Sequence, residues 1–297
     1  MKSFLKNTQC QSFLKKQNLI YKTVAFFVAS LSVLFLSSCC KAGDCECHNN
    51  CNENQDYQEY FIAHAGGAID GINYTNCVEA LDLSYSKGCK LFELDLKLST
   101  DGKIVATHES SDMPEAEFMN RLIEGKYTPM NIDAINLWFR NHPDAILVTD
   151  KINDPERVCK EFLFLDRLIM ELFTWKEVDK AIELGIKPMV SENLIFGNSQ
   201  KAIELGIEPI DCGKVNIEII LAEKNIQYIC MSYRRIAEHK NLLKRMKENG
   251  IKNYVFHLEN PISGQPGEQY IWENEMKYCY GMYANDLDLL TSLLIKK

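Results

Sequence analysis

With 297 residues, the chain is long enough for one large α/β barrel or for two ordinary domains, and composition alone does not decide between them. The formal net charge is -8 at pH 7, and no Lys- or Arg-rich run is interleaved with aromatic residues. Both features argue against a protein that binds nucleic acid. Bulk charge therefore does not indicate which substrate or partner this protein selects.

The first 38 residues have the pattern of an export signal. Residues 1–22 contain five lysines and no acidic residue, and residues 24–38 form a continuous run of apolar and small residues. This run is shorter than the roughly 20 apolar residues that a membrane-spanning helix usually needs. The pattern therefore predicts a signal peptide over residues 1–38, with an uncleaved N-terminal anchor as the alternative. In either case we expect the rest of the chain to be exported.

The end of this segment, Leu36-Ser37-Ser38-Cys39, resembles the lipobox of bacterial lipoproteins. In that motif the cysteine becomes the lipidated first residue of the mature chain. The resemblance implies that Cys39 is lipidated and that the lipid holds the protein at the membrane of the bacterial cell envelope.

Residues 39–57 indicate a polar tether, and we expect the folded domain to cover residues 58–297. The tether is also rich in cysteine, with Cys39, Cys40, Cys45, Cys47 and Cys51. Together with His48 these residues could imitate a metal site, but their spacing matches no zinc pattern. An exported chain favours disulfides, so a locally crosslinked tether is the preferred interpretation and a metal site the alternative.

The first element of the expected domain is a short apolar strand, Tyr60 to Ala63. It leads directly into His64-Ala65-Gly66-Gly67, which places a histidine at the carboxyl end of a strand beside a flexible loop. Thr75-Asn76 then predicts the start of a helix that runs to about Lys87 and ends at Gly88.

The stretch Phe92 to Glu109 carries the strongest functional pattern in the chain. At the strand period of two, Glu93, Asp95 and Lys97 share one face, and the opposite face is apolar. A turn at residues 100–102 and a second strand over residues 103–107 follow, and that strand ends at His108. Two acids and a histidine therefore converge through a hairpin. The plain alternative is a solvated edge hairpin whose acids form salt bridges to Lys97 or Lys151.

These motifs, in this order, resemble the glycerophosphodiester phosphodiesterase family over residues 60–109. The matching segments are His64-Ala65-Gly66, Tyr74-Thr75-Asn76, Glu93-Leu94-Asp95, Asp101-Gly102 and His108-Glu109. Two departures stand out: the arginine that follows the family's first histidine is Ala65 here, and the Pro-Glu-Asn-Thr motif is Asn73-Tyr74-Thr75-Asn76, without the acid. The joint loss indicates a divergent branch with a different substrate.

The rest of the chain predicts alternating helices and strands. Residues 110–130 indicate a loop with a short helical piece over the site. Beyond it we expect helices over 131–141, 155–164, 176–184, 236–248 and 268–278, and strands over 145–151, 167–174, 187–191, 225–232, 253–258 and 280–284. Residues 180–188 and 201–209 are near copies, each typical of a helix end, a glycine cap and the start of a strand.

Repeated βα units of this length predict a (β/α)8 barrel, a TIM barrel like that of the phospholipase-C-like phosphodiesterases that the motifs resemble. We expect irregularity around residues 207–215. A doubly wound open sheet is the alternative, but no Gly-x-Gly-x-x-Gly motif follows any expected strand.

In a barrel, reactive side chains gather at the carboxyl ends of the strands. Glu93 and Asp95, with Asp150 as the third ligand, suit a hard divalent cation, Mg²⁺ or Ca²⁺. The family places a glutamate two residues before its lysine, Lys151 here, and in strict alternation that place belongs to Thr149. Asp150 would then face the other way, so we expect a bulge at the strand end to turn it inward.

We expect His64 and His108, on opposite sides of the site, to act as general acid and base, because imidazoles exchange protons near neutral pH. We expect Lys151 to hold a phosphate oxygen. The leading hypothesis is metal-dependent hydrolysis of a glycerophosphodiester or a lipid-derived phosphodiester at the cell envelope. One alternative is a phospholipase-like lyase that forms a cyclic phosphate. Another is a catalytically inactive, lipid-anchored binding protein, which the loss of the arginine would favour.

Overall fold

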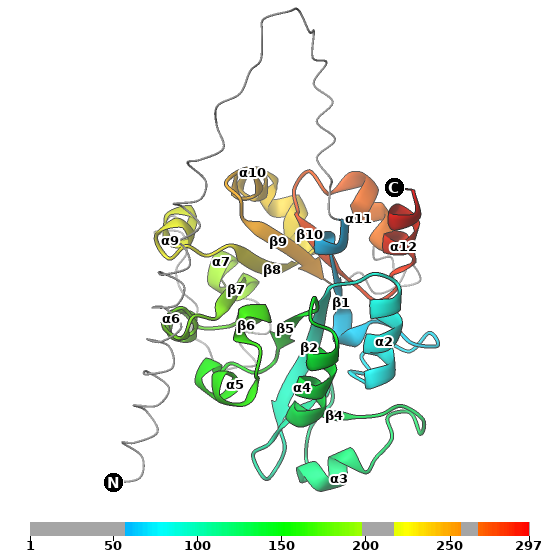
Figure 1. Ribbon diagram of the computed structural model, residues 1–297. Helices are drawn as coiled ribbons and strands as arrows, with labels where there is room; N and C mark the ends of the chain where they lie inside the picture. Colours follow the sequence, from blue (N-terminus) through cyan, green and yellow to red (C-terminus); the bar gives the residue numbers. More distant parts are fainter. Residues whose placement is uncertain (1–56, 198–216, 257–266, 297) are drawn as a thin grey trace, which may run out of the picture. The chain divides into compact units, whose positions relative to one another are not determined.

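A computed structural model of the protein describes residues 57–197, 217–256 and 267–296, all within one compact unit that runs from Asn54 to Lys297 (Figure 1). Eight parallel strands close into a barrel in chain order, because the first strand pairs with both the second and the last. These strands are β1 (Phe61–Ala63), β2 (Leu91–Leu98), β5 (Ile146–Asp150), β6 (Leu168–Leu172), β7 (Lys187–Ser191), β8 (Tyr228–Ser232), β9 (Lys252–Phe256) and β10 (Gly281–Ala284).

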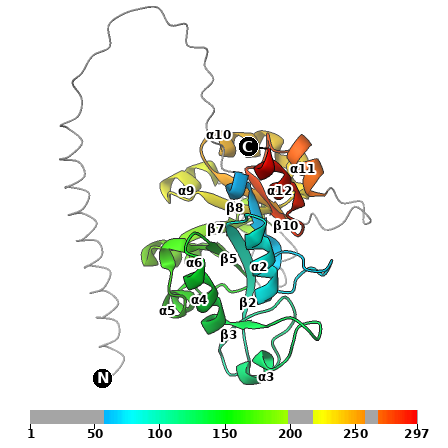
Figure 2. The same ribbon diagram turned by 45° about the vertical axis from the view of Figure 1, so that its right-hand side comes forward.

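Helices between the strands cover the outside of the barrel (Figures 1 and 2). They are α2 (Val78–Ser86), α4 (Ile132–Asn141), α5 (Pro155–Glu161), α6 (Trp175–Leu184), α7 (Glu192–Phe196), α9 (Ile217–Glu223), α10 (Arg234–Glu248), α11 (Glu268–Asn274) and α12 (Asp288–Ile295). None of the helices in the described ranges is both long enough and apolar enough to cross a membrane. The (β/α)8 barrel expected from the alternating pattern is confirmed.

Side chains that alternate along each strand form two buried clusters, one inside the barrel and one between the barrel and its helices. One side chain from each barrel strand meets in a buried cluster inside the barrel, and the intervening residues pack outward against the helices. The inner cluster consists of Ile62, Leu91, Val148, Ile169, Met189, Cys230, Tyr254 and Tyr283. Because these residues fill the lower part of the barrel, only the carboxyl ends of the strands are left for polar chemistry.

A short antiparallel sheet extends the barrel at β2. The carboxyl half of β2 pairs with β3 (Ile104–Ala106), and β3 pairs with β4 (Met130–Asn131). The segment between β3 and β4 contains α3 (Glu115–Met119), and both views show it at the lower edge of the picture. This is the loop with a helical piece that the sequence predicts after His108.

Several details of the sequence prediction are wrong. Helix α2 is capped by Cys77, whose Sγ accepts from the backbone N–H of Ala80, and not by Thr75-Asn76. The sequence also gives no prediction for α7, α9 or α12. The glycine cap of the first near copy is confirmed at Gly185, whose φ is 76°. The second near copy, the irregular region around 207–215, and residues 1–56 lie outside the described ranges.

The amino-terminal end of the barrel is closed by aromatic packing. The 3-10 helix η1 (Tyr57–Tyr60) places two tyrosine rings against Trp272, and Tyr60 also contacts Tyr280. Gly281 has no room for a side chain, because a Cβ there would lie 2.6 Å from the carbonyl oxygen of Tyr60. This end of the barrel is therefore a packed floor.

Candidate active site

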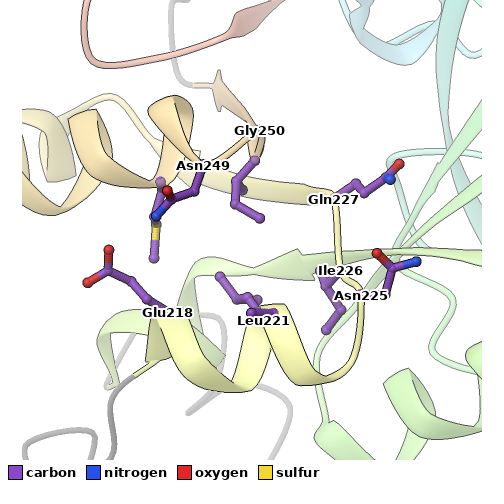
Figure 3. Close-up of a pocket in the computed structure, with 10 residues that line it drawn as sticks. Glu218, Leu221, Asn225, Ile226, Gln227, Asn249 and Gly250 are labelled. Atoms are coloured by element: carbon purple, nitrogen blue, oxygen red, sulfur yellow. The ribbon is translucent and has the colours of Figure 1, made fainter.

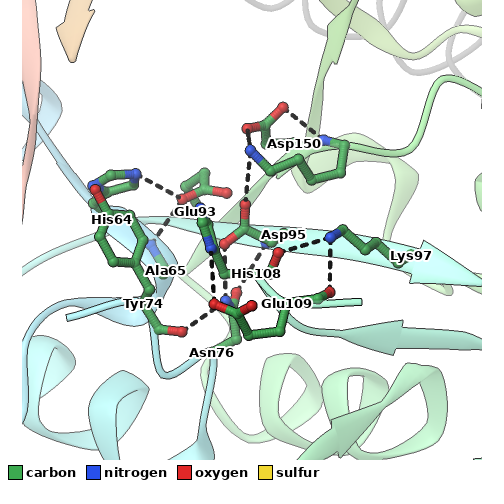
Figure 4. A network of polar contacts seen from close by, with 11 residues as sticks. His64, Ala65, Tyr74, Asn76, Glu93, Asp95, Lys97, His108, Glu109 and Asp150 are labelled. Atoms are coloured by element: carbon green, nitrogen blue, oxygen red, sulfur yellow. Dashed lines mark hydrogen bonds and ion pairs between the residues drawn. The ribbon is translucent and has the colours of Figure 1, made fainter. Parts of the chain in front are cut away.

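The loop after β1 brings His64 to the carboxyl end of the barrel. In the 3-10 turn η2 (His64–Gly66) the backbone of Ala65 is left-handed, with φ 48°, and Gly67 follows with φ 96°. This turn directs the N–H of Ala65 at Glu93, whose Oε2 accepts it at 2.7 Å (Figure 4). His64 itself lies beside Glu93, with 4.0 Å between Nε2 and Oε2. At the position of the family arginine, the chain thus offers a backbone donor in place of a guanidinium.

Three carboxylates converge next to this loop. Glu93, Asp95 and Asp150 each place an oxygen within 4.8 Å of the others. Asp150 reaches the cluster without the bulge that we expected, since Asp95 and Asp150 are paired in register on β2 and β5. The inward face of β5 therefore carries Val148 and Asp150, and Thr149 faces outward.

Glu93 is buried, at 1% exposure, and so is Asp95. Burial raises the pKa of its carboxyl well above the ordinary value, and the charges of Asp95 and Asp150 raise it further. Its Oε1 atom is buried and has no hydrogen-bond partner among the described residues. A buried carboxylate oxygen without a donor is costly, so this oxygen lacks the cation or donor that its surroundings call for.

Lys151 follows the cluster in a left-handed conformation, with φ 66°. Its Nζ lies 3.1 Å from Asp150 Oδ2 and 3.5 Å from Asp95 Oδ1. Of the two lysines that could pair with the acids, Lys151 does so and Lys97 does not. The side chain of Lys151 is 29% exposed, so its ammonium sits between the carboxylates and the solvent at the barrel mouth.

Asn76 holds Asp95 in place, a role that the sequence prediction missed. Its Oδ1 accepts from the backbone N–H of Asp95 and its Nδ2 donates to Asp95 Oδ2, each at 2.9 Å. Asn76 is fully buried, and its own N–H donates to the carbonyl of Ala65 at 3.0 Å. The sequence signal was an asparagine in a helix-start motif; its side chain stabilises the acid and leaves the cap to Cys77.

The two histidines lie on the same side of the cluster, with Tyr74 between them, and not on opposite sides as expected (Figure 4). The Tyr74 ring centroid is 4.9 Å from that of His64 and 4.5 Å from that of His108. Burial lowers the pKa of His64 to about 4, although the charges of Asp95 and Asp150 act to raise it. His64 is therefore neutral at pH 7. His108 is much more open, at 40% exposure of its side chain.

A separate cavity lies far from this chemistry. It has a volume of about 520 Å³ and is lined by residues of α9, the end of α10 and the segments that lead into β8 and β9 (Figure 3). These segments belong to the amino-terminal ends of the strands. Among the described residues that line the cavity, Glu218 is the one acid, and it is paired with Arg245 at 2.9 Å. We therefore place the candidate site at the mouth and not in this cavity.

The residues at the mouth fit a divalent cation. Oxygen ligands from carboxylates are what Mg²⁺ and Ca²⁺ bind, and the cluster supplies three, one of them with an unpaired buried oxygen. The protein is a closed (β/α)8 barrel that carries three carboxylates and, beside them, two histidines at the carboxyl ends of its strands.

Solved structures of other proteins have a similar fold. No family model and no curated protein matches the sequence. A glycerophosphodiester phosphodiesterase from Parabacteroides distasonis aligns with a TM-score of 0.58 at 14% identity, over 80% of this chain and 96% of that chain. The glycerophosphodiester phosphodiesterase of Thermotoga maritima gives 0.55 at 18% identity, over 79% and 97%. An Oleispira antarctica phosphodiesterase in complex with the product sn-glycerol-3-phosphate gives 0.52 at 14% identity, over 79% and 96%. This chain shares the barrel fold of these enzymes.

Proposed function

We propose that the protein is a divalent-metal-dependent phosphodiesterase that hydrolyses a glycerophosphodiester or a related lipid-derived phosphodiester. The observation that carries the proposal is the convergence of Glu93, Asp95 and Asp150 in one mouth with two histidines. The structures of similar fold are glycerophosphodiester phosphodiesterases, which supports the same class of reaction.

Each group has a role that its surroundings support. A bound Mg²⁺ or Ca²⁺ would neutralise part of the phosphodiester charge. Lys151, between the acids and the solvent, donates to another phosphate oxygen. His64, neutral at pH 7, accepts a proton from the attacking water, whose oxygen bonds to phosphorus as the P–O bond to the departing alcohol breaks. The more open His108 donates a proton to the oxygen of that alcohol.

The assay that tests this function measures turnover of the purified protein on a panel of glycerophosphodiesters, with and without a chelator. Phosphorus NMR of the products identifies the reaction. We expect a monoester and a free alcohol, formed only when the cation is present. A cyclic phosphate as the final product would assign the lyase reaction instead. Binding of the diester without turnover, at any cation concentration, would indicate an inactive binding protein.

We further propose that the enzyme is exported and anchored to the cell envelope by a lipid on Cys39. The support is the sequence pattern of residues 1–39, a basic start, an apolar run and the Leu36-Ser37-Ser38-Cys39 motif. Mass spectrometry of the mature N-terminus tests it. We expect a chain that begins at Cys39 and carries a lipid; an unmodified chain that begins before Cys39 would contradict the anchor and leave the barrel untouched.

A further inference from the structure

Within the described residues, Tyr74 is the one aromatic side chain that contacts both histidines of the site. Its ring meets that of His64 nearly at a right angle, with 80° between the planes, and it is tilted by 40° against that of His108. Both contacts lie in the range of centroid distances at which aromatic rings attract each other. A second aromatic neighbour of His64 is Tyr283, which is buried inside the barrel; the centroids of the two rings lie 5.8 Å apart.

The backbone that carries Tyr74 is held in an unusual conformation. Seven non-glycine residues in the described ranges have a positive φ, and four of them border the site: Ala65, Tyr74, Asn76 and Lys151. Such conformations are unfavourable for residues with a side chain, and they persist where the surroundings impose them. For Tyr74, with φ 62°, the constraint comes from its neighbours in the chain.

Both sides of the Tyr74 loop are fixed. After Tyr74, the buried Asn76 is bonded to Asp95 and to Ala65. Before it, Asp70 accepts from the hydroxyl of Tyr127 at 2.8 Å, in the segment between β3 and β4. A small apolar cluster lies beneath, made of Cys77, Ala80 and Tyr127 with Ile69, Ile72 and Ile123 packed against it. The backbone that carries Tyr74 is therefore held on both sides.

We propose that Tyr74 is a positioning residue that sets the distance and orientation of the His64 and His108 imidazoles toward each other. This inference rests on the proposed function, because it assumes that both histidines transfer protons. His108 is 40% exposed on its side chain, so without a ring against it many rotamers would be open to it. Proton transfer requires a donor and an acceptor at hydrogen-bonding distance from the reacting atoms, and small displacements lower the rate steeply.

The test compares Tyr74→Leu with Tyr74→Phe in the full chain. Phe keeps the ring and removes only the hydroxyl, whereas Leu removes the ring. We expect Tyr74→Leu to lower kcat by about 10- to 100-fold with little change in KM, and Tyr74→Phe to stay near the wild type. Tyr270→Leu is the matched control, because Tyr270 is 48% exposed on α11 and outside the site; it should leave kcat unchanged.

A second measurement does not need turnover. The chain has six histidines, so selective isotope labelling gives a simple set of imidazole NMR signals, assigned with the His64→Gln and His108→Gln variants. A nearby aromatic ring shifts those signals. We expect Tyr74→Leu to move the signals of both His64 and His108, and Tyr74→Phe to move neither appreciably.

The outcomes separate the two proposals. Unmoved histidine signals in Tyr74→Leu would overturn the contact, and moved signals with an unchanged kcat would overturn the positioning role. If the wild-type protein hydrolyses no phosphodiester, the proposed function fails and so does any catalytic role for Tyr74. The NMR comparison then still decides whether Tyr74 arranges the two imidazoles.

Discussion

The ammonium of Lys97 donates to the carbonyl oxygen of His108 at 2.7 Å, and equally to that of Glu109 (Figure 4). Lys97 follows Glu93 and Asp95 on the inward face of β2. One strand therefore carries two proposed metal ligands and the lysine that holds the backbone of His108, the proposed proton donor. The hairpin turn brings His108 back to the same strand.

Replacing Lys97 with Met should therefore impair catalysis more than folding. Met keeps most of the apolar stem but cannot donate to the two carbonyls, so the backbone at His108 loses its fixed position. We expect kcat to fall by about tenfold with KM nearly unchanged. Lys103→Met, in the exposed turn of the same hairpin, is the control. Equal effects of the two variants on kcat would contradict the role of Lys97.

The metal site should fail when either central ligand loses its charge. Glu93→Gln and Asp95→Asn preserve shape and remove the negative charge that a hard cation requires. We expect each variant to lose measurable Mg²⁺ or Ca²⁺ binding by isothermal titration calorimetry, and with it the metal-dependent turnover. Asp112→Asn, on an exposed loop, should bind as the wild type does. Wild-type affinity in either ligand variant would refute the assignment.

The raised pKa of Glu93 predicts an unusual stability profile for the metal-free protein. Between pH 4.5 and the higher folded-state pKa, the unfolded chain releases a proton that the folded chain keeps, so stability falls as pH rises. Glu93→Gln has no proton to release. In urea unfolding with a chelator, we expect the stability of Glu93→Gln relative to the wild type to increase from pH 5 to pH 8. A constant difference would contradict the shift.

The histidines should behave as catalysts and not as structural groups. His64→Gln and His108→Gln keep a hydrogen-bonding side chain but cannot exchange protons near pH 7, so kcat should fall by about 10²–10⁴-fold at nearly unchanged substrate binding. His142→Gln provides the comparison, since His142 stacks on Trp138 at 3.9 Å and serves the packing of α4. It should lower the melting temperature and leave kcat intact. If His64→Gln and His108→Gln instead lower the melting temperature and leave kcat intact, the proposed roles are wrong.

The aromatic floor should be sensitive to a single methyl group. A Cβ on Gly281 would lie 2.6 Å from the carbonyl oxygen of Tyr60 and from the ring of Tyr254. Gly281→Ala should therefore cost about 1–3 kcal/mol of unfolding free energy in urea titrations. Gly267→Ala meets no atom within 4 Å and should change stability by less than about 0.5 kcal/mol. Similar values for the two would argue against a tightly packed floor.

The barrel was predictable because its strands have simple patterns. Short apolar runs between helical segments give the order and number of elements, and Gly185 gives a helix end. The helices that could not be predicted are short, or have no clear division between a polar and an apolar face. Helix α7 has only five residues, and α12 is apolar over most of its length, so neither shows the alternation of polar and apolar faces that identifies a helix.

The candidate site was predicted in its residues but not in its contacts. The motif spacing identifies Glu93, Asp95 and His108. It could not show that Tyr74 reaches both histidines, because that contact depends on left-handed backbone conformations in a loop. The bulge at Asp150 was expected because a family spacing was imposed on β5, whereas the register with β2 already turns Asp150 inward.

The pairing of β1 with β10 links the site to the order in which the chain is made. Every proposed catalytic or metal-binding residue lies between His64 and Lys151, so all of them are synthesised before β10 (Gly281–Ala284). Strand β1, which leads into His64, gains its second neighbour only when residues 281–284 are available. A nascent or C-terminally truncated chain would therefore hold all the chemical groups on an open sheet. We expect activity only once β10 has paired with β1 and closed the barrel.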